Sequence, residues 1–136
     1  MFVIRKIFNA GTNLPEPFLM PASQSAAYRV GCALKIDNGE MVNALSTEKP
    51  TFIAAENAAK GEKTKIACYP VFPNMLFEVP LLGSPSEIKV GSKLTLVAGD
   101  GGFIDSVGND TTGGVATVID VNGAVESGDT VYVRFD

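Results

Sequence analysis

The chain has 136 residues and a formal net charge of −4; 46% of its residues are hydrophobic, 19% are charged, and none is histidine. This composition excludes a wholly disordered chain, because disorder requires low hydrophobicity and high charge. The lack of histidine excludes histidine acid–base catalysis, serine–histidine and cysteine–histidine nucleophile pairs, and histidine-liganded metal sites. An acidic chain is also a poor binder of nucleic acid or anionic lipid through bulk electrostatics.

The two cysteines, Cys32 and Cys68, are too far apart for a CxxC redox motif and too few for a thiolate zinc site. Each lies on the apolar side of its own predicted strand, so we expect both to be small core residues. No apolar stretch approaches the 18 residues of a membrane span, and the first residues lack the pattern of a secretory signal. We therefore expect synthesis in a reducing compartment, with no membrane partner.

Residues 1–27 are predicted to form an extended N-terminal arm. The segment contains three prolines, Pro15, Pro17 and Pro21. Proline removes backbone donors and interrupts regular ladders. The large apolar residues between these prolines are Phe18, Leu19 and Met20. A free linker would be polar, so the arm is expected to lie on a surface, either on its own domain or on another subunit.

Apolar and polar residues alternate with period two after the arm, which indicates strands. The first predicted strand covers residues 30–36, and the turn signal Asp37–Gly39 predicts a return strand at residues 41–45. Three further strands are expected at residues 51–55, 64–69 and 75–81. The alanine-rich residues 54–60 fit either a short helix or a hairpin loop.

The second half continues this pattern with glycine-rich connections. Its predicted strands lie around residues 94–97, 115–121 and 130–135. The loops between them cover residues 98–102, 107–114 and 121–123, where glycine and asparagine supply the positive φ angles of tight turns. Residues 28–136 are therefore predicted to form a single all-β domain, either an antiparallel β-barrel or a compact sandwich.

Three aspartates, Asp100, Asp105 and Asp110, are expected in glycine-rich loops at five-residue spacing. Calcium prefers several oxygen ligands from a flexible loop, but the ligand order of an EF-hand is absent, and solvated turn aspartates explain the pattern. Residues 99–102 lack the Gly-Lys-Ser/Thr ending of a phosphate-binding loop. We therefore expect no enzyme: no catalytic residue, no cofactor and no metal site, which leaves a binding or structural role.

A binding protein of this kind is expected to use exposed apolar residues rather than titrating groups. The leading candidates are Phe18, Leu19 and Met20 in the arm. The loop at residues 69–74 is the second candidate, because its two prolines hold Val71 and Phe72 in a stiff turn whose ordering on binding costs little entropy. The alternative for this loop is a plug on the barrel's own end.

Three segments of the second half also carry a resemblance to a known family: residues 88–97, 114–123 and 127–135. Three earlier segments, residues 30–34, 49–54 and 65–70, are compatible with the same type. In outline, residues 28–135 resemble the β-barrel of bacteriophage capsid decoration proteins, also called cement or head-stabilising proteins. The residues before 28 lie outside this resemblance.

The resemblance implies a non-enzymatic virion protein, made in the bacterial host cytoplasm and placed on the outside of the head. Such proteins bridge neighbouring subunits of the major capsid protein, most often as homotrimers. Deletion of residues 1–27 is expected to weaken this binding while the barrel still folds. The alternatives are another structural phage part, such as a tail-tube, connector or fibre-base domain, or a small calcium-dependent carbohydrate-binding or hydrolytic domain that uses the three aspartates.

Overall fold

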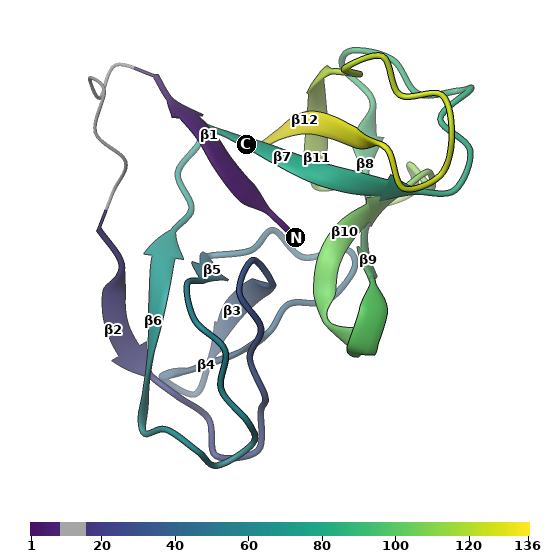
Figure 1. The fold of residues 1–136 in the computed structure, drawn as a ribbon. Coiled ribbons are helices and arrows are strands. Elements are labelled where there is room, and N and C mark those ends of the chain that lie inside the picture. Colours follow the sequence, from purple (N-terminus) through teal and green to yellow (C-terminus); the bar gives the residue numbers. More distant parts are fainter. Residues whose placement is uncertain (9–15) are drawn as a thin grey trace.

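The computed structural model describes residues 1–8 and 16–136, which form two β-sheets (Figure 1), and the predicted all-β class is confirmed. Besides the strands it contains a 3₁₀ turn at Asp100–Gly102. None of the described residues belongs to a helix long and apolar enough to cross a membrane. The strands are β1 (Val3–Ile7), β2 (Phe18–Pro21), β3 (Ala33–Asp37), β4 (Glu40–Asn43), β5 (Phe52–Ala54), β6 (Lys65–Pro70), β7 (Met75–Leu82), β8 (Lys93–Leu94), β9 (Leu96–Ala98), β10 (Ile104–Gly108), β11 (Ala116–Asp120) and β12 (Thr130–Phe135).

The first sheet is built around β7, in the order β8-β11-β12-β7-β10-β9. Strand β12 pairs with one edge of β7, while β1 and β10 share the opposite edge. All these pairs are antiparallel except β10 with β7. Buried and half-buried residues alternate along β7, as expected of a strand with one face on a core.

The second sheet has the order β2-β6-β5-β3-β4, and every pair in it is antiparallel. A parallel bridge between Ala22 and Met41 joins the end of β2 to β4. Because these strands lie at opposite ends of the order, the bridge curls the sheet nearly into a closed barrel. Its interior is a separate apolar cluster that includes Cys32 and Cys68, both buried and free of disulfides.

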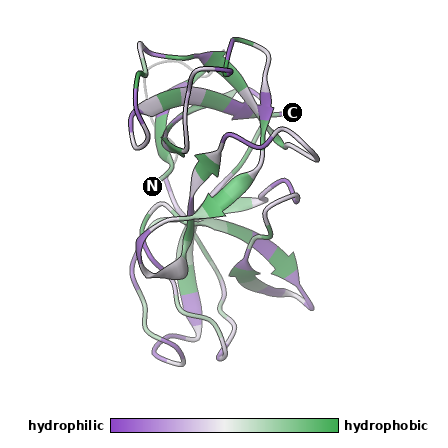
Figure 2. Ribbon diagram, turned by 90° about the vertical axis from the view of Figure 1, so that its right-hand side faces the viewer, coloured by the Kyte–Doolittle hydropathy of each residue, from purple (hydrophilic) through white to green (hydrophobic). Residues whose placement is uncertain are grey.

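Strand β1 lies where the two sheets meet. The buried ring of Phe2 packs against Phe77 and Phe135 of the first sheet, and the Phe2 amide donates to the Gly31 carbonyl at 2.9 Å. Gly31 has a φ of 82°, and a Cβ there would approach the Met1 Cβ to 2.3 Å, so this junction requires glycine. Figure 2 shows that green hydrophobic residues recur along strands of both sheets, as shared packing requires.

Residues 1–27 do not project from the domain in their described parts. Strand β1 pairs with β7 of the first sheet, and β2 pairs with β6 of the second. Pro15 lies outside the described residues. Because Phe2 belongs to the first core, we now expect deletion of residues 1–27 to destabilise the remaining chain as well as to weaken binding.

Two local expectations are also settled by the pairing. Residues 54–60 form no helix but a hairpin loop between β5 and β6, in which Ala58 bridges to Tyr28. Strand β10 was not predicted, because its sequence Ile-Asp-Ser-Val-Gly lacks period-two alternation. Four of its five residues are nevertheless buried, since β7 and β9 cover its edges.

Candidate interaction surface

The first candidate segment forms β2, an outer strand of the second sheet beside β6 (Figure 1). Phe18 and Leu19 are 57% and 66% exposed, which is unusual for such large apolar side chains on adjacent positions. Met20 differs, because it is partly buried and packs against the second core. Two of the three predicted arm residues therefore present apolar surface, and the third stabilises the barrel.

Proline shapes the outer edge of β2. The Ala22 amide donates to the Thr64 carbonyl, so in an antiparallel ladder Met20 and Phe18 also direct their backbone groups toward β6. The backbone groups of Leu19 and Pro21 consequently face the outer edge, and Pro21 has no N–H to leave unpaired there. This edge is a poor template for an added strand, so a partner would contact the side chains rather than the backbone.

The second candidate segment, the loop between β6 and β7, also contains both a buried and an exposed candidate residue. Val71 is buried in the first core and offers no exposed surface. Phe72 is 55% exposed. The loop is held firmly, because the Phe8 amide donates to the Asn74 carbonyl and the Asn74 side chain donates to the Phe8 carbonyl at 2.9 Å.

The structure brings the exposed members of both segments to one end of β6. Phe18 pairs with Cys68 near the end of this strand, and Phe72 follows two residues after the strand ends. We define the candidate interaction surface as the exposed residues of the two segments, Phe18, Leu19 and Phe72; as successive residues of β2, Phe18 and Leu19 point to opposite faces of the sheet. Met20 and Val71 face the two cores instead.

Sequence reasoning did not single out the exposed residues Val90 and Val125, which are 67% and 82% exposed. Each is a solitary valine in a polar loop, so no local pattern marks it. The Val125 turn is rigid, because the Asp129 carboxylate accepts the backbone N–H groups of Val125 and Glu126. These hydrogen bonds hold the pKa of Asp129 below its usual range.

The three aspartates occupy different environments. Asp105 lies in β10 rather than in a loop, where it is buried and accepts a hydrogen bond from Ser106 at 3.1 Å. Asp100 belongs to the 3₁₀ turn, and Asp110 accepts the Thr112 amide in an exposed turn. Within residues 1–8 and 16–136, no group of three histidine, cysteine or acidic side chains is placed to hold a metal ion.

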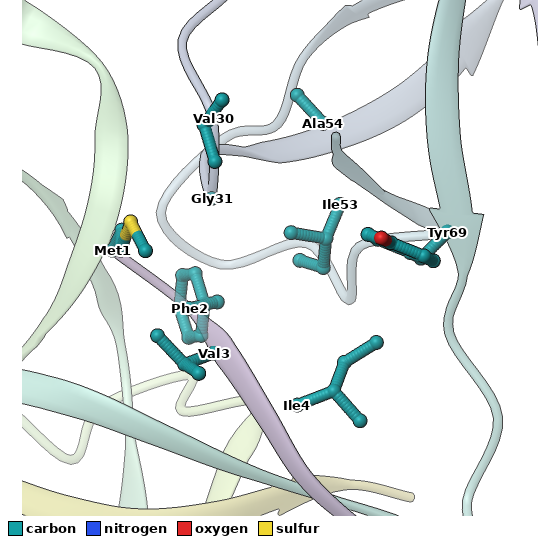
Figure 3. A pocket seen from close by; sticks show the side chains of 9 residues that line it. All are labelled: Met1, Phe2, Val3, Ile4, Val30, Gly31, Ile53, Ala54 and Tyr69. Carbon is teal, nitrogen blue, oxygen red and sulfur yellow. The ribbon is translucent and has the colours of Figure 1, made fainter. Parts of the chain in front are cut away.

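An apolar cavity of about 180 Å³ lies between β1 and the second sheet (Figure 3). Its lining contains one polar side chain, that of Tyr69, beside residues such as Phe2, Ile4 and Ile53. A small-molecule site normally combines an apolar lining with several convergent polar groups. This cavity lacks that combination, so the exposed apolar residues remain the better candidate for a function.

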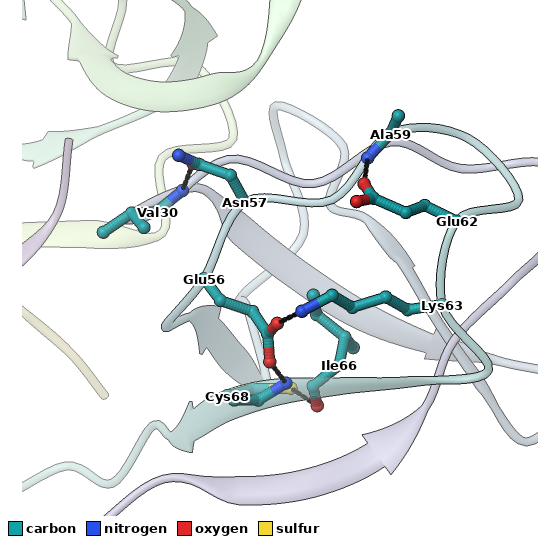
Figure 4. Close-up of polar contacts among 9 residues, drawn as sticks. Val30, Glu56, Asn57, Ala59, Glu62, Lys63, Ile66 and Cys68 are labelled. Atoms are coloured by element: carbon teal, nitrogen blue, oxygen red, sulfur yellow. Dashed lines mark hydrogen bonds and ion pairs between the residues drawn. The ribbon is translucent and has the colours of Figure 1, made fainter.

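Polar contacts in the loop between β5 and β6 are structural (Figure 4). Glu56 pairs with Lys63 and also accepts the Ala67 amide at 2.8 Å, so one carboxylate ties the loop to β6. The Lys63 hydrogen bond, followed by that from Ala67, lowers the pKa of Glu56. Asn57 accepts the Val30 amide at 2.9 Å, which anchors the loop to the segment before β3.

Comparison with known proteins gives one informative similarity. No family model matches the chain. No curated protein matches it either. Among solved structures, the chain is similar to the head fiber gp8.5 N base of bacteriophage phi29, with a TM-score of 0.51 and 21% identity over 88% of this chain and 92% of that chain. The two proteins share a fold. At 21% identity this similarity shows the fold alone.

Proposed function

We propose that this chain is a structural protein of a bacteriophage head that binds the outside of the shell. The observation that supports the proposal most strongly is the shared fold with the base of a phage head fiber, which extends over 92% of that chain. The resemblance of residues 28–135 to capsid decoration proteins points to the same location. In this proposal the chain bridges neighbouring subunits of the major capsid protein and stabilises the mature shell.

The physical properties of the candidate interaction surface suit such a role. Phe72 lies in a turn pinned to β1, and Phe18 and Leu19 lie on a paired strand, so little conformational entropy is lost on binding. A protein that binds only the mature lattice stabilises that lattice by mass action. Many copies on one shell add avidity to modest individual contacts. The net charge of −4 is no obstacle, since the partner is a protein.

The direct test mixes the purified chain with mature and unexpanded heads of the phage that encodes it. Sedimentation should show saturable binding to mature heads and weak or no binding to unexpanded ones. Light scattering of the free chain tests the accompanying proposal of a homotrimer. A chain that binds neither kind of head would overturn the proposed function, whatever its oligomeric state.

Substitutions locate the contact. The double variant Phe18→Ser with Leu19→Ser removes two side chains that are each worth about 1.5–3 kcal/mol when buried, so binding should weaken by about 100-fold or more. The matched control, Val90→Ser with Val125→Ser, changes equally exposed apolar residues on the loops of the first sheet and should bind normally. The opposite result would assign the contact to those loops.

A second candidate, the base of a head fibre, is favoured because the structure with the similar fold is such a base. Both candidates predict binding to the head. Cryo-electron microscopy of phage particles separates them, because a decoration protein accounts for all the density at its lattice position. A fibre base would instead continue into further density that projects from the shell.

A further inference from the structure

The chain contains two Asn-Gly pairs, Asn38-Gly39 and Asn122-Gly123, and both occupy exposed turns of nearly the same geometry. Their φ angles are 50° and 78° in the first turn and 53° and 67° in the second. Positive φ at both positions is typical of type I′ turns, which Asn-Gly favours. The first turn lies between the paired residues Asp37 and Glu40, and the second is closed by the Ala124 amide bonded to the Val121 carbonyl.

The two turns differ in what holds the asparagine. The Asn122 side chain donates to the Thr130 hydroxyl at 3.3 Å, and its backbone amide donates to the Asp120 carboxylate at 2.7 Å. The Asn38 side chain has no hydrogen-bond partner among residues 1–8 and 16–136. Around Gly39, a Cβ would meet no atom within 4 Å, so the space beside the backbone is open.

We propose that Asn38 is a site of spontaneous deamidation and that its hydrogen bonds protect Asn122. The Gly39 nitrogen attacks the Asn38 side-chain carbonyl carbon, the new C–N bond closes a succinimide, and the amide nitrogen leaves as ammonia with the former Gly39 proton. Water then opens either carbonyl and yields aspartate or isoaspartate. The attack breaks no ladder hydrogen bond, since Gly39 is one of the two turn residues between Asp37 and Glu40.

The modification has a structural consequence, because isoaspartate inserts a methylene group into the backbone of a two-residue turn. Turn length sets strand register, so the pairing of β3 with β4 is disturbed. Met41 on β4 is fully buried, and its carbonyl accepts the Tyr28 hydroxyl inside the second core. Chains that carry isoaspartate at position 38 are therefore expected to melt at a lower temperature than fresh chains.

The test ages the full chain in mildly alkaline buffer and maps peptides by mass spectrometry, which detects the amide-to-carboxyl mass change and separates isoaspartate. Native protein should deamidate about fivefold faster at Asn38 than at Asn122. This is the rate ratio expected if one ordinary hydrogen bond must break before Asn122 can react. In denaturant the two rates should converge, because the fold no longer distinguishes the sites. Equal native rates, or faster reaction at Asn122, would overturn the proposal.

Two variants sharpen the result. Thr130→Val removes the acceptor of the Asn122 side chain and should raise the rate at Asn122 toward that at Asn38. Asn38→Asp supplies the added charge, and its ionised carboxylate closes the succinimide far more slowly in alkaline buffer, so its melting temperature should fall more slowly on ageing than that of the wild type. An unchanged rate at Asn122 in folded Thr130→Val would remove the hydrogen bond as the explanation.

Discussion

Tyr28 joins two backbone segments through one buried hydroxyl in the second core. Its ring is buried, its hydroxyl donates to the Met41 carbonyl, and the same oxygen accepts the Ser23 amide at 2.8 Å. Sequence patterning does not reveal this role, because the partners lie 5 and 13 residues away and meet only when the sheet curls. The one hydroxyl satisfies two buried backbone groups.

Replacement of Tyr28 by phenylalanine should therefore lower the free energy of unfolding by about 1–3 kcal/mol, the usual cost of leaving buried polar groups unpaired. Urea denaturation measures the loss. The matched control is Tyr69→Phe, since the Tyr69 hydroxyl has no hydrogen-bond partner in the described part of the chain. Equal losses in the two variants would show that the Tyr28 hydroxyl is not the stabilising group.

The buried thiols make stability depend on alkaline pH. Burial raises the pKa of Cys32 to about 11 and that of Cys68 to about 12, from an ordinary value of 9.0. Between pH 9 and the raised pKa values, the thiols keep their protons in the folded chain and lose them in the unfolded chain. The free energy of unfolding should therefore be unaffected by the thiols below pH 9 and should fall as the pH rises from 9 toward 12.

Denaturation at stepwise pH tests this linkage against a double variant, Cys32→Ala with Cys68→Ala. The variant should be less stable at neutral pH, because two small cavities remain in the core. Its alkaline decline should nevertheless be shallower than that of the wild type. Parallel declines in the two proteins would assign the effect to other groups, among them Tyr28, whose pKa is also raised by burial.

At the scale of elements, the predicted strands with strict alternation are present. The structure contains β7 and β12 close to their predicted bounds, because period two places every second side chain on a buried face. Strands β1 and β2 replace parts of the predicted arm, and β10 is missed as well, because its polar Asp105 and Ser106 are buried by contacts distant in sequence. For the candidate surface, the sequence identified the segments, but only their packing separated Phe18 and Phe72 from Val71.

The residues that flank β1 test how much this segment contributes to stability. Phe2→Ala should cost about 3–5 kcal/mol of unfolding free energy, because the ring packs against two other phenylalanines in the first core. Phe8→Ala, at the exposed end of the same segment, should cost less than about 1 kcal/mol. Thermal melting of both variants measures the contrast. Similar melting temperatures would contradict the central position of β1.

At the scale of the whole molecule, the two sheets are joined through shared packing. The first core includes Ala33, Ala44 and Ile53 from the second sheet and its connections. Two backbone hydrogen bonds cross the junction, from Phe2 to Gly31 and from Leu96 to Ser46, each at 2.9 Å. Because the first core takes residues from both sheets, the domain is expected to unfold in one cooperative step although the second sheet encloses a cluster of its own.

Thiol labelling offers a local probe of that cooperativity, since Cys32 and Cys68 both lie in the second core. Their exposure in a denaturant series should follow the loss of far-ultraviolet circular dichroism, which reports both sheets together. Coincident midpoints are expected. Labelling at clearly lower denaturant than the loss of circular dichroism would show that the second sheet opens by itself.

The amino-acid sequence by itself determined the all-β class, the positions of most strands and turns, and the absence of histidine chemistry, because each of these follows from local spacing or composition. Only the tertiary structure decided that residues 1–8 complete the first core, that β2 closes a curled second sheet, and that Phe18, Leu19 and Phe72 stay exposed. These outcomes depend on pairings between distant segments, such as β1 with β7 and β2 with β6. Local sequence carries little information about such pairings, since any edge with matching alternation can accept the same strand.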